Sequence, residues 1–303
     1  MDTSAPNPWS LYWQGGHIDS CIANAGAEDR AIVSAVWKDL VSALPAAAKV
    51  LDLATGNGAV PLDLLTADPE LEITGVDLAQ IAPDTLLDAA PLLSRVQFLG
   101  GIDICKLPFE AHSFDAVTSQ FGIEYAPLAQ ALAEVARVLK PRGRLRFLVH
   151  HVDSAVVAPA AELVAEIDHL YRDNGLLAAF NQYLAGAMDL ASLEAAGRNY
   201  MGESRVRTQH ISGQVMVGIN QVIVDLQAQP QRAQLLAQSM QSRMRAERSR
   251  LGQLRSAALD IDGASTLCHQ LESLGLGDVE SRTVEVPGEA PALIGWQFSA
   301  TMK

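Results

Sequence analysis

Two closely spaced glycines follow an apolar run near the start of the sequence. The run and the glycines read VLDLATGNG over residues 50–58, and a helical pattern comes directly after them. Glycine allows positive φ angles and a close approach of the backbone to a ligand, and the first turn of a helix leaves N–H groups without partners. Such a loop at the carboxyl end of a buried strand is typical of a site for a nucleotide-like cofactor.

The identity of that cofactor depends on the groups that the loop must accommodate. A dinucleotide site uses the pattern G-x-G-x-x-G, because its pyrophosphate lies at the helix N-terminus, but the third glycine position here is Pro61. S-adenosylmethionine has no phosphate and carries a sulfonium, an amine and a carboxylate, so its site needs a tight turn and nearby acids. Asp52, just before the turn, is a candidate for contacting the amino end of this methyl donor.

Two further acids follow the next two predicted strands. Asp77 ends the second strand, nineteen positions after Gly58, where an acid accepts hydrogen bonds from both ribose hydroxyls. Asp103 follows the third strand, where it can accept from an adenine amino group while Ile104 packs on the ring. A helix cap or an ordinary turn residue is the alternative interpretation of each acid.

The elements that carry these residues alternate between strand and helix. Apolar runs predict strands at 49–53, 72–76, 96–100, 114–119 and 143–150. Helical periodicity predicts helices at 31–44, 60–67, 85–93 and 127–139. Strands separated by helices predict a doubly wound α/β fold, in which a mostly parallel sheet has helices on both faces.

Four parts are expected along the chain. They are an N-terminal helical cap at 1–44, a cofactor-binding core at 45–152, a helical insertion at 153–264, and a closing helix and strand pair at 265–303. The insertion has no strand pattern and is predicted to form helices at 156–171, 176–196 and 213–254. It is long enough to serve either as a lid over the substrate or as the interface of a homodimer. The last strands, 279–286 and 291–301, flank the short turn Pro287–Gly288, which predicts an antiparallel pair.

Composition restricts the partners. Hydrophobic residues make up 49% of the 303 residues and charged residues 19%, so the chain can fill a sizeable core, and its net charge of -13 disfavours DNA or RNA. Cys21, Cys105 and Cys268 are too far apart for a metal-binding pattern and are expected to be free thiols in a reducing compartment. No apolar run approaches the roughly 20 residues of a membrane-spanning helix, and no signal peptide is evident. A cytoplasmic protein is expected, with neither a metal nor a membrane partner.

The order and spacing of four motifs resemble class I S-adenosylmethionine-dependent methyltransferases, in particular the ubiquinone/menaquinone-biosynthesis-like branch. The motifs are DLATGNG at 52–58, GVD at 75–77, FDAV at 114–117 and RVLKPRG at 137–143. The likeness extends over 49–150, with a weaker part at 279–301. It implies a Rossmann-like, seven-stranded sheet with strand order 3-2-1-4-5-7-6. One departure is Ala54, which stands where the family loop has its first glycine.

The resemblance also implies which residues contact the methyl donor. The loop at 54–58 is expected to surround the methionine part, Asp77 to bind the ribose, and residues after the fourth strand to lie near the methionine end. The expected set of cofactor-binding residues is Asp52, Ala54, Thr55, Gly56, Gly58, Asp77, Leu78, Asp103, Ile104, Ser119 and Gln120.

Candidates for acid–base chemistry lie at the ends of the fourth and fifth strands. Glu124 follows the fourth strand, where methyl acceptors enter similar enzymes, although it can also cap the next helix. His150 and His151 end the fifth strand, and because neighbouring strand residues point to opposite faces, at most one faces the site. His151 is predicted as the general base. The aromatic segment 9–17 is either a flap over the donor or a packing surface.

The sequence therefore predicts a methyltransferase that transfers a methyl group from S-adenosylmethionine to a small molecule, with O- or C-methylation favoured. A base is needed only if the acceptor must lose a proton. The alternatives are an NAD-dependent oxidoreductase, which Pro61 disfavours, and a non-catalytic scaffold that retained the fold, which the intact loop and Asp77 disfavour.

Overall fold

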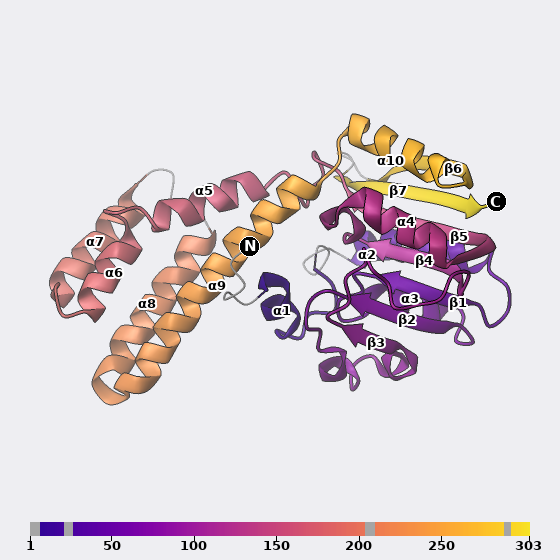
Figure 1. Ribbon diagram of the computed structural model, residues 1–303. Coiled ribbons are helices and arrows are strands. Elements are labelled where there is room, and N and C mark those ends of the chain that lie inside the picture. Colours follow the sequence, from indigo (N-terminus) through magenta and orange to yellow (C-terminus); the bar gives the residue numbers. More distant parts are fainter. Residues whose placement is uncertain (1–6, 21–26, 204–209, 288–291) are drawn as a thin grey trace. The chain divides into compact units, whose positions relative to one another are not determined.

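The computed structural model describes residues 7–20, 27–203, 210–287 and 292–303. The chain forms two compact units, of which the first contains Met1–Ala158 and Gln253–Lys303 and the second Pro159–Gly252. The whole sheet belongs to the first unit, and the second unit is built from helices (Figure 1). The helical unit is thus inserted between two stretches of chain that build one sheet.

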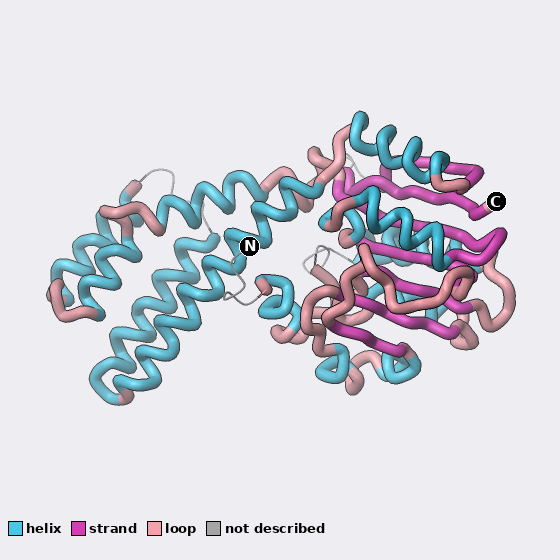
Figure 2. Tube along the Cα trace, viewed as in Figure 1, coloured by secondary structure: helices cyan, strands magenta, loops and turns pink. Residues whose placement is uncertain are grey.

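The sheet has seven strands in the order β3-β2-β1-β4-β5-β7-β6, which confirms the predicted order. The strands are drawn in magenta in Figure 2. Strands β1 to β5 pair in parallel, and β7 pairs antiparallel with both β5 and β6. The strand bounds are β1 Lys49–Leu53, β2 Glu72–Asp77, β3 Gln97–Gly100, β4 Phe114–Gln120, β5 Leu139–His150, β6 Leu276–Val286 and β7 Ala292–Met302. The turn predicted at Pro287–Gly288 lies partly outside the described residues.

Helices cover both faces of this sheet, and two hydrophobic cores result. Neighbouring residues of a strand point to opposite faces, so Val50 packs in the core with α2 and α3 while Leu51 packs in the core with α4 and α10. The helices of this unit are α1 Pro8–Trp13, α2 Ala27–Val41, α3 Ala59–Ala67, α4 Leu128–Val138 and α10 Ile261–Ser273, with a short 3₁₀ turn η3 at Ile123–Tyr125.

One predicted helix is absent from its place between β2 and β3. Two short 3₁₀ turns, η1 Pro83–Leu86 and η2 Pro91–Arg95, occupy the stretch predicted as the helix 85–93. Each turn begins at a proline, which has no N–H to donate and disfavours helical geometry in the residue before it. Pro91 therefore interrupts the apolar periodicity from which the helix was predicted.

The inserted unit contains more helices than its sequence pattern indicates. Its helices are α5 Ala160–Leu170, α6 Leu176–Leu184, α7 Leu190–Gly202, α8 His210–Ala228 and α9 Pro230–Ala257, whose last residues belong to the first unit. The predicted helix 176–196 is interrupted at Gly186, which has a φ of 72°, and α7 starts anew at the N-cap Asp189. The predicted helix 213–254 is interrupted before Pro230, because proline cannot donate to the preceding turn.

The two ends of the insertion meet beside β5. The backbone N–H of Leu259 donates to the carbonyl of His150 at 2.8 Å, and the N–H of Val152 donates to the carbonyl of Leu259 at 3.2 Å. The chain therefore leaves and rejoins the sheet-containing unit at neighbouring positions.

Among the described residues, no helix is long and apolar enough to cross a membrane, and no three His, Cys, Asp or Glu side chains are grouped so that they could hold a metal ion. Cys105 and Cys268 are free thiols, and Cys21 lies outside the described residues.

Candidate functional site

A cavity of about 730 Å³ opens at the carboxyl ends of the parallel strands. Its wall includes residues that follow β1, β2, β3 and β4, together with parts of α1 and the last turn of α9. The predicted site residues in this wall are Asp52, Ala54, Thr55, Asp77, Leu78, Asp103, Ile104, Gln120 and Glu124. Gly56, Gly58, Ser119 and His151 are not part of it.

The loop after β1 is held in an uncommon backbone conformation. Ala54 has a φ of 52°, Gly56 of 53° and Gly58 of 100°, where Gly58 is the N-cap of α3. Ala54 holds this positive φ although it carries a side chain. A side chain is disfavoured at positive φ, and such residues cluster at functional sites. At Gly56 a Cβ atom would lie 2.4 Å from the Trp13 ring, so only glycine allows this ring to close on the loop.

Asp77 connects this loop to the strand beside it. Its Oδ2 accepts the N–H of Gly56 at 2.9 Å, and its Oδ1 accepts the N–H of Ala79 at 2.8 Å. Burial raises the pKa of Asp77, while these two backbone bonds act in the opposite direction. Each carboxylate oxygen has a second lone pair, so Asp77 can still accept from a ligand.

Asp52 is a second buried acid of the cavity whose pKa is raised. It is 1% exposed, and burial raises its pKa from 3.8 to about 7, although the nearby hydroxyls of Thr55 and Thr118 act in the opposite direction, the latter through a 2.7 Å hydrogen bond to Oδ1. The neighbouring charge of Asp77 adds to the rise. Within the described part of the chain its Oδ2 has no hydrogen-bond partner. A buried carboxylate of this kind favours a cationic ligand.

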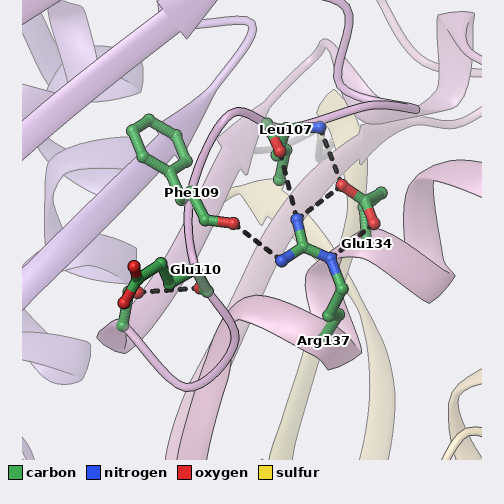
Figure 3. Close-up of polar contacts among 6 residues, drawn as sticks. Leu107, Phe109, Glu110, Glu134 and Arg137 are labelled. Carbon is green, nitrogen blue, oxygen red and sulfur yellow. Dashed lines mark hydrogen bonds and ion pairs between the residues drawn. The ribbon is translucent and has the colours of Figure 1, made fainter.

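An arginine clamp fixes the loop that carries Asp103. The Arg137 guanidinium binds the carboxylate of Glu134 through Nε and Nη2, both at 2.7 Å, and donates to the carbonyls of Leu107 and Phe109 (Figure 3). Glu134 in turn accepts the N–H of Leu107 at 2.7 Å. Bidentate pairs of this type restrain geometry strongly, so the clamp positions the segment after β3.

The aromatic N-terminal segment forms part of the cavity wall. Trp9 and Trp13 of α1 line it, and the Asn57 side chain holds the segment in place. Asn57 Nδ2 donates to the carbonyls of Trp13 and His17 at 2.9 and 2.8 Å, and its Oδ1 accepts the N–H of Ala82. The segment thus both lines the cavity and packs against the loop after β1.

Two predicted cofactor-binding residues at the end of β4 form hydrogen bonds within the fold. Ser119 Oγ donates to the carbonyl of Leu53 at 3.0 Å and accepts the N–H of Ile123, so it links β1 to the turn after β4. Gln120 lines the cavity, and its Oε1 accepts the indole N–H of Trp37 at 2.9 Å.

The histidine that meets Glu124 is His150 and not His151. Glu124 Oε1 accepts both the backbone N–H of His150 at 3.0 Å and its Nδ1 at 2.7 Å. The His151 ring stacks on Trp296 with centroids 4.9 Å apart, on the face of the sheet opposite to His150, and it does not reach the cavity. The prediction of His151 as the general base is corrected on this ground.

Sequence reasoning missed the roles of Asn57 and His150. Asn57 lies inside the glycine motif, but its partners are 40 and 44 positions away, so its role depends on tertiary structure. The sequence shows two adjacent histidines at the end of β5. Which of them meets Glu124 depends on the face of the sheet to which each side chain points.

The chain is similar to known methyltransferases over this core. Residues 50–143 match a family model described as a methyltransferase domain. The ubiquinone/menaquinone biosynthesis C-methyltransferase UbiE of Dinoroseobacter shibae is 40% identical over 120 residues, which cover 37% of this chain and 48% of that protein. The demethylmenaquinone methyltransferase of Deinococcus radiodurans is 34% identical over 158 residues, 52% of this chain and 59% of that protein. The demethylmenaquinone methyltransferase of Thermotoga maritima is 43% identical over 105 residues, 33% of this chain and 42% of that protein.

The strand order, the glycine turn and the acids after successive strands define the core as a class I methyltransferase domain, the class whose methyl donor is S-adenosylmethionine. Within that class its similarity is to the ubiquinone/menaquinone-like branch. The chain spans about half the length of the relatives named here.

Proposed function

We propose that this protein binds S-adenosylmethionine in the described cavity and transfers its methyl group to a small molecule, with O- or C-methylation favoured. The observation that carries the proposal is Asp52, a buried carboxylate with an unpartnered oxygen in the cavity wall. The donor's ammonium and sulfonium groups match this acid and its neighbour Asp77, because opposite charges favour the ionised carboxylates.

The residues around the cavity have distinct proposed roles. Asp52 contacts the amino end of the donor, Asp77 accepts from the ribose hydroxyls, and Asp103 with Leu78 and Ile104 surrounds the adenine. The 54–58 loop, with Gln120, lies along the methionine part. The bound donor supplies an electrophilic methyl group for in-line displacement. The protein aligns the acceptor with that group and excludes water, and the Trp9 and Trp13 side chains of α1 support the exclusion.

The charges in the cavity disfavour a dinucleotide. A pyrophosphate beside Asp52 and Asp77 would meet two buried acids, and α3 carries Pro61 in place of the third glycine. Nothing in the cavity favours the oxidoreductase alternative.

Isothermal titration of the full chain with S-adenosylhomocysteine and with NADH tests the proposal. We expect binding of the first compound and none of the second, and binding of NADH alone would refute it. Asp77→Ala should lower the affinity for S-adenosylhomocysteine by at least about tenfold, because it removes acceptors for the ribose. Asp88→Ala, an exposed acid outside the cavity wall, is the matched control.

A further inference from the structure

One largely exposed face of α8 carries no charge. It consists of eight positions that fall on one side of a helix with about 3.6 residues per turn; they are Gly213, Gln214, Val217, Asn220, Gln221, Val224, Gln227 and Ala228. We call these eight residues the neutral face. Val217 is 70% exposed and Val224 68%, whereas α9, the next helix, carries six arginines and one glutamate. The neutral face therefore differs from a solvated helix face, which is ordinarily polar and charged.

The two neighbouring helices contact α8 at positions outside the neutral face. Helices α8 and α9 run side by side (Figure 1), and a Cβ atom at Gly218 would lie 2.7 Å from Sδ of Met240 in α9. Toward α7, a Cβ atom at Gly197 would lie 3.2 Å from Cε of Met216. Neither contact covers the valines of the neutral face.

An apolar groove adjoins the neutral face. A cavity of about 260 Å³ opens between α7 and α8, and Asn220 of the neutral face is part of its wall. The apolar residues of this wall are Leu176, Leu193, Met201, Met216, Ile219 and Ile223. Apolar surface that continues into uncharged positions is typical of protein interfaces, whose centres are depleted of charged residues.

The neutral face is self-complementary about its midpoint between Asn220 and Gln221. Positions equally distant from this midpoint carry the same chemistry: valine at 217 and 224, glutamine at 214 and 227, an amide at 220 and 221, and a small residue at 213 and 228. A two-fold axis through the midpoint would bring these pairs together between two antiparallel copies of the helix, because such an interface uses the same patch on both copies. Valines then pack against valines, and amides, which both donate and accept, meet amides.

A second copy of this chain fits the neutral face better than a membrane or a charged partner. Helices that lie on membrane surfaces carry lysine or arginine on their polar side, and α8 contains neither. A charged partner would find no opposite charge among the eight positions. Copies of a chain with a net charge of -13 repel each other through acidic surfaces, and contact through an uncharged face avoids local repulsion.

We propose that the neutral face of α8 pairs with the same face of a second copy of this chain in antiparallel orientation. Val217 of one copy packs against Val224 of the other, and the amides at 220 and 221 meet at the axis. The groove between α7 and α8 borders this contact and extends it. The helical insertion then serves as the interface of a homodimer.

The mass of the full chain in solution tests the pairing. Light scattering after size exclusion at about 50 µM should give twice the 32.4 kDa of one chain. Val217→Glu/Val224→Glu places like charges against each other across the axis and should raise the dimer dissociation constant at least about hundredfold. Val217→Lys/Val224→Lys should do the same, and an equimolar mixture of the two variants should restore the dimer. Ile261→Glu, at a valine-like exposure of 69% on α10, is the matched control and should remain dimeric.

Disulfide cross-linking tests the antiparallel orientation. Across the proposed axis, position 220 is displaced from its own copy by only about 1.5 Å along the helix, so oxidation of Asn220→Cys should join two chains. Position 214 would be about 20 Å from its own copy, so Gln214→Cys should stay unlinked, although a parallel pair would join it. The wild type, with its three cysteines, is oxidised alongside as the blank.

Three results would overturn the inference: the mass of a single chain at that concentration, a mass above that of two chains, or equal cross-linking of Gln214→Cys and Asn220→Cys. A single-chain mass together with flotation of the wild type on vesicles of anionic lipid would assign the neutral face to a membrane surface instead. Far-UV circular dichroism of every variant should match that of the wild type, which separates loss of the dimer from loss of the fold.

Discussion

Replacing Asp52 by asparagine should stabilise the unliganded protein at alkaline pH and weaken its binding of the donor. A carboxylate whose pKa is raised by folding, here from 3.8 to about 7, makes its full contribution to stability below 3.8 and loses it as the pH rises through 7. The gap between the two pKa values corresponds to about 4 kcal/mol, because a tenfold change in an equilibrium is worth about 1.4 kcal/mol. Roughly 1.6 kcal/mol of this is lost by about pH 5.

The neutral amide of Asp52→Asn resembles the protonated acid and keeps an oxygen for Thr118. The stability of this variant relative to the wild type should therefore increase by about 2.5 kcal/mol between about pH 5 and about pH 8.5. Urea unfolding followed by tryptophan fluorescence measures this difference. It reports on the sheet-containing unit, because the four tryptophans, at positions 9, 13, 37 and 296, all belong to it.

Asp39→Asn is the control, because folding lowers the pKa of Asp39 and raises that of Asp52. The hydrogen bond from Arg146 lowers the pKa of Asp39, so this carboxylate stabilises the fold above its ordinary pKa and its removal should destabilise at both pH values. Isothermal titration with S-adenosylhomocysteine should show weaker binding only for Asp52→Asn. Parallel stabilities of Asp52→Asn and wild type at all pH values would refute the reasoning about burial, and unchanged donor affinity would refute the contact.

Three further substitutions test the framework of the site. A Cβ atom at Gly122 would lie 2.4 Å from that of Ala54, so Gly122→Ala should lower the free energy of unfolding by about 1–3 kcal/mol, and adding Ala54→Gly should restore most of it; a double-mutant cycle without coupling would contradict this. Asn57→Ala removes three hydrogen bonds and should cost about 2–4 kcal/mol in urea unfolding, and a loss under about 0.5 kcal/mol would show that they contribute little. Arg137→Lys cannot keep the bidentate clamp and should lower the melting temperature by several degrees, with an unchanged value as the contrary result.

The sequence predicted most of the sheet because each strand is a short apolar run followed by a turn. The runs beginning at Lys49, Glu72 and Phe114 all became parallel strands, and Asp52 and Asp77, near the carboxyl ends of the first two, lie at the same edge as the topology requires. The helix expected at 85–93 failed because a single proline outweighed an apolar periodicity that was otherwise helical. The local sequence pattern does not show whether the proline or the apolar periodicity decides the structure.

The lining of the cavity was predictable where a residue's place follows from its position at a strand end, as for Asp52 and Asp77. It was not predictable where a residue's contacts depend on the face of the sheet to which its side chain points, or on partners far away in the sequence. His150 and His151 are adjacent, and only the pairing of β5 with β7 decides that the first meets Glu124 while the second stacks on Trp296.

The pairing of Leu259 with the end of β5 has a consequence for how this architecture diversifies. The segments that lead into and out of the inserted helices are hydrogen-bonded to each other at His150, Val152 and Leu259. The number of inserted residues can therefore change without shifting either flanking strand. Most of the described cavity wall comes from the chain before that junction, and the last turn of α9, which belongs to the sheet-containing unit, adds Gln253, Ser256 and Ala257. Exchange of the inserted helices for others would thus leave the described wall of the cavity in place.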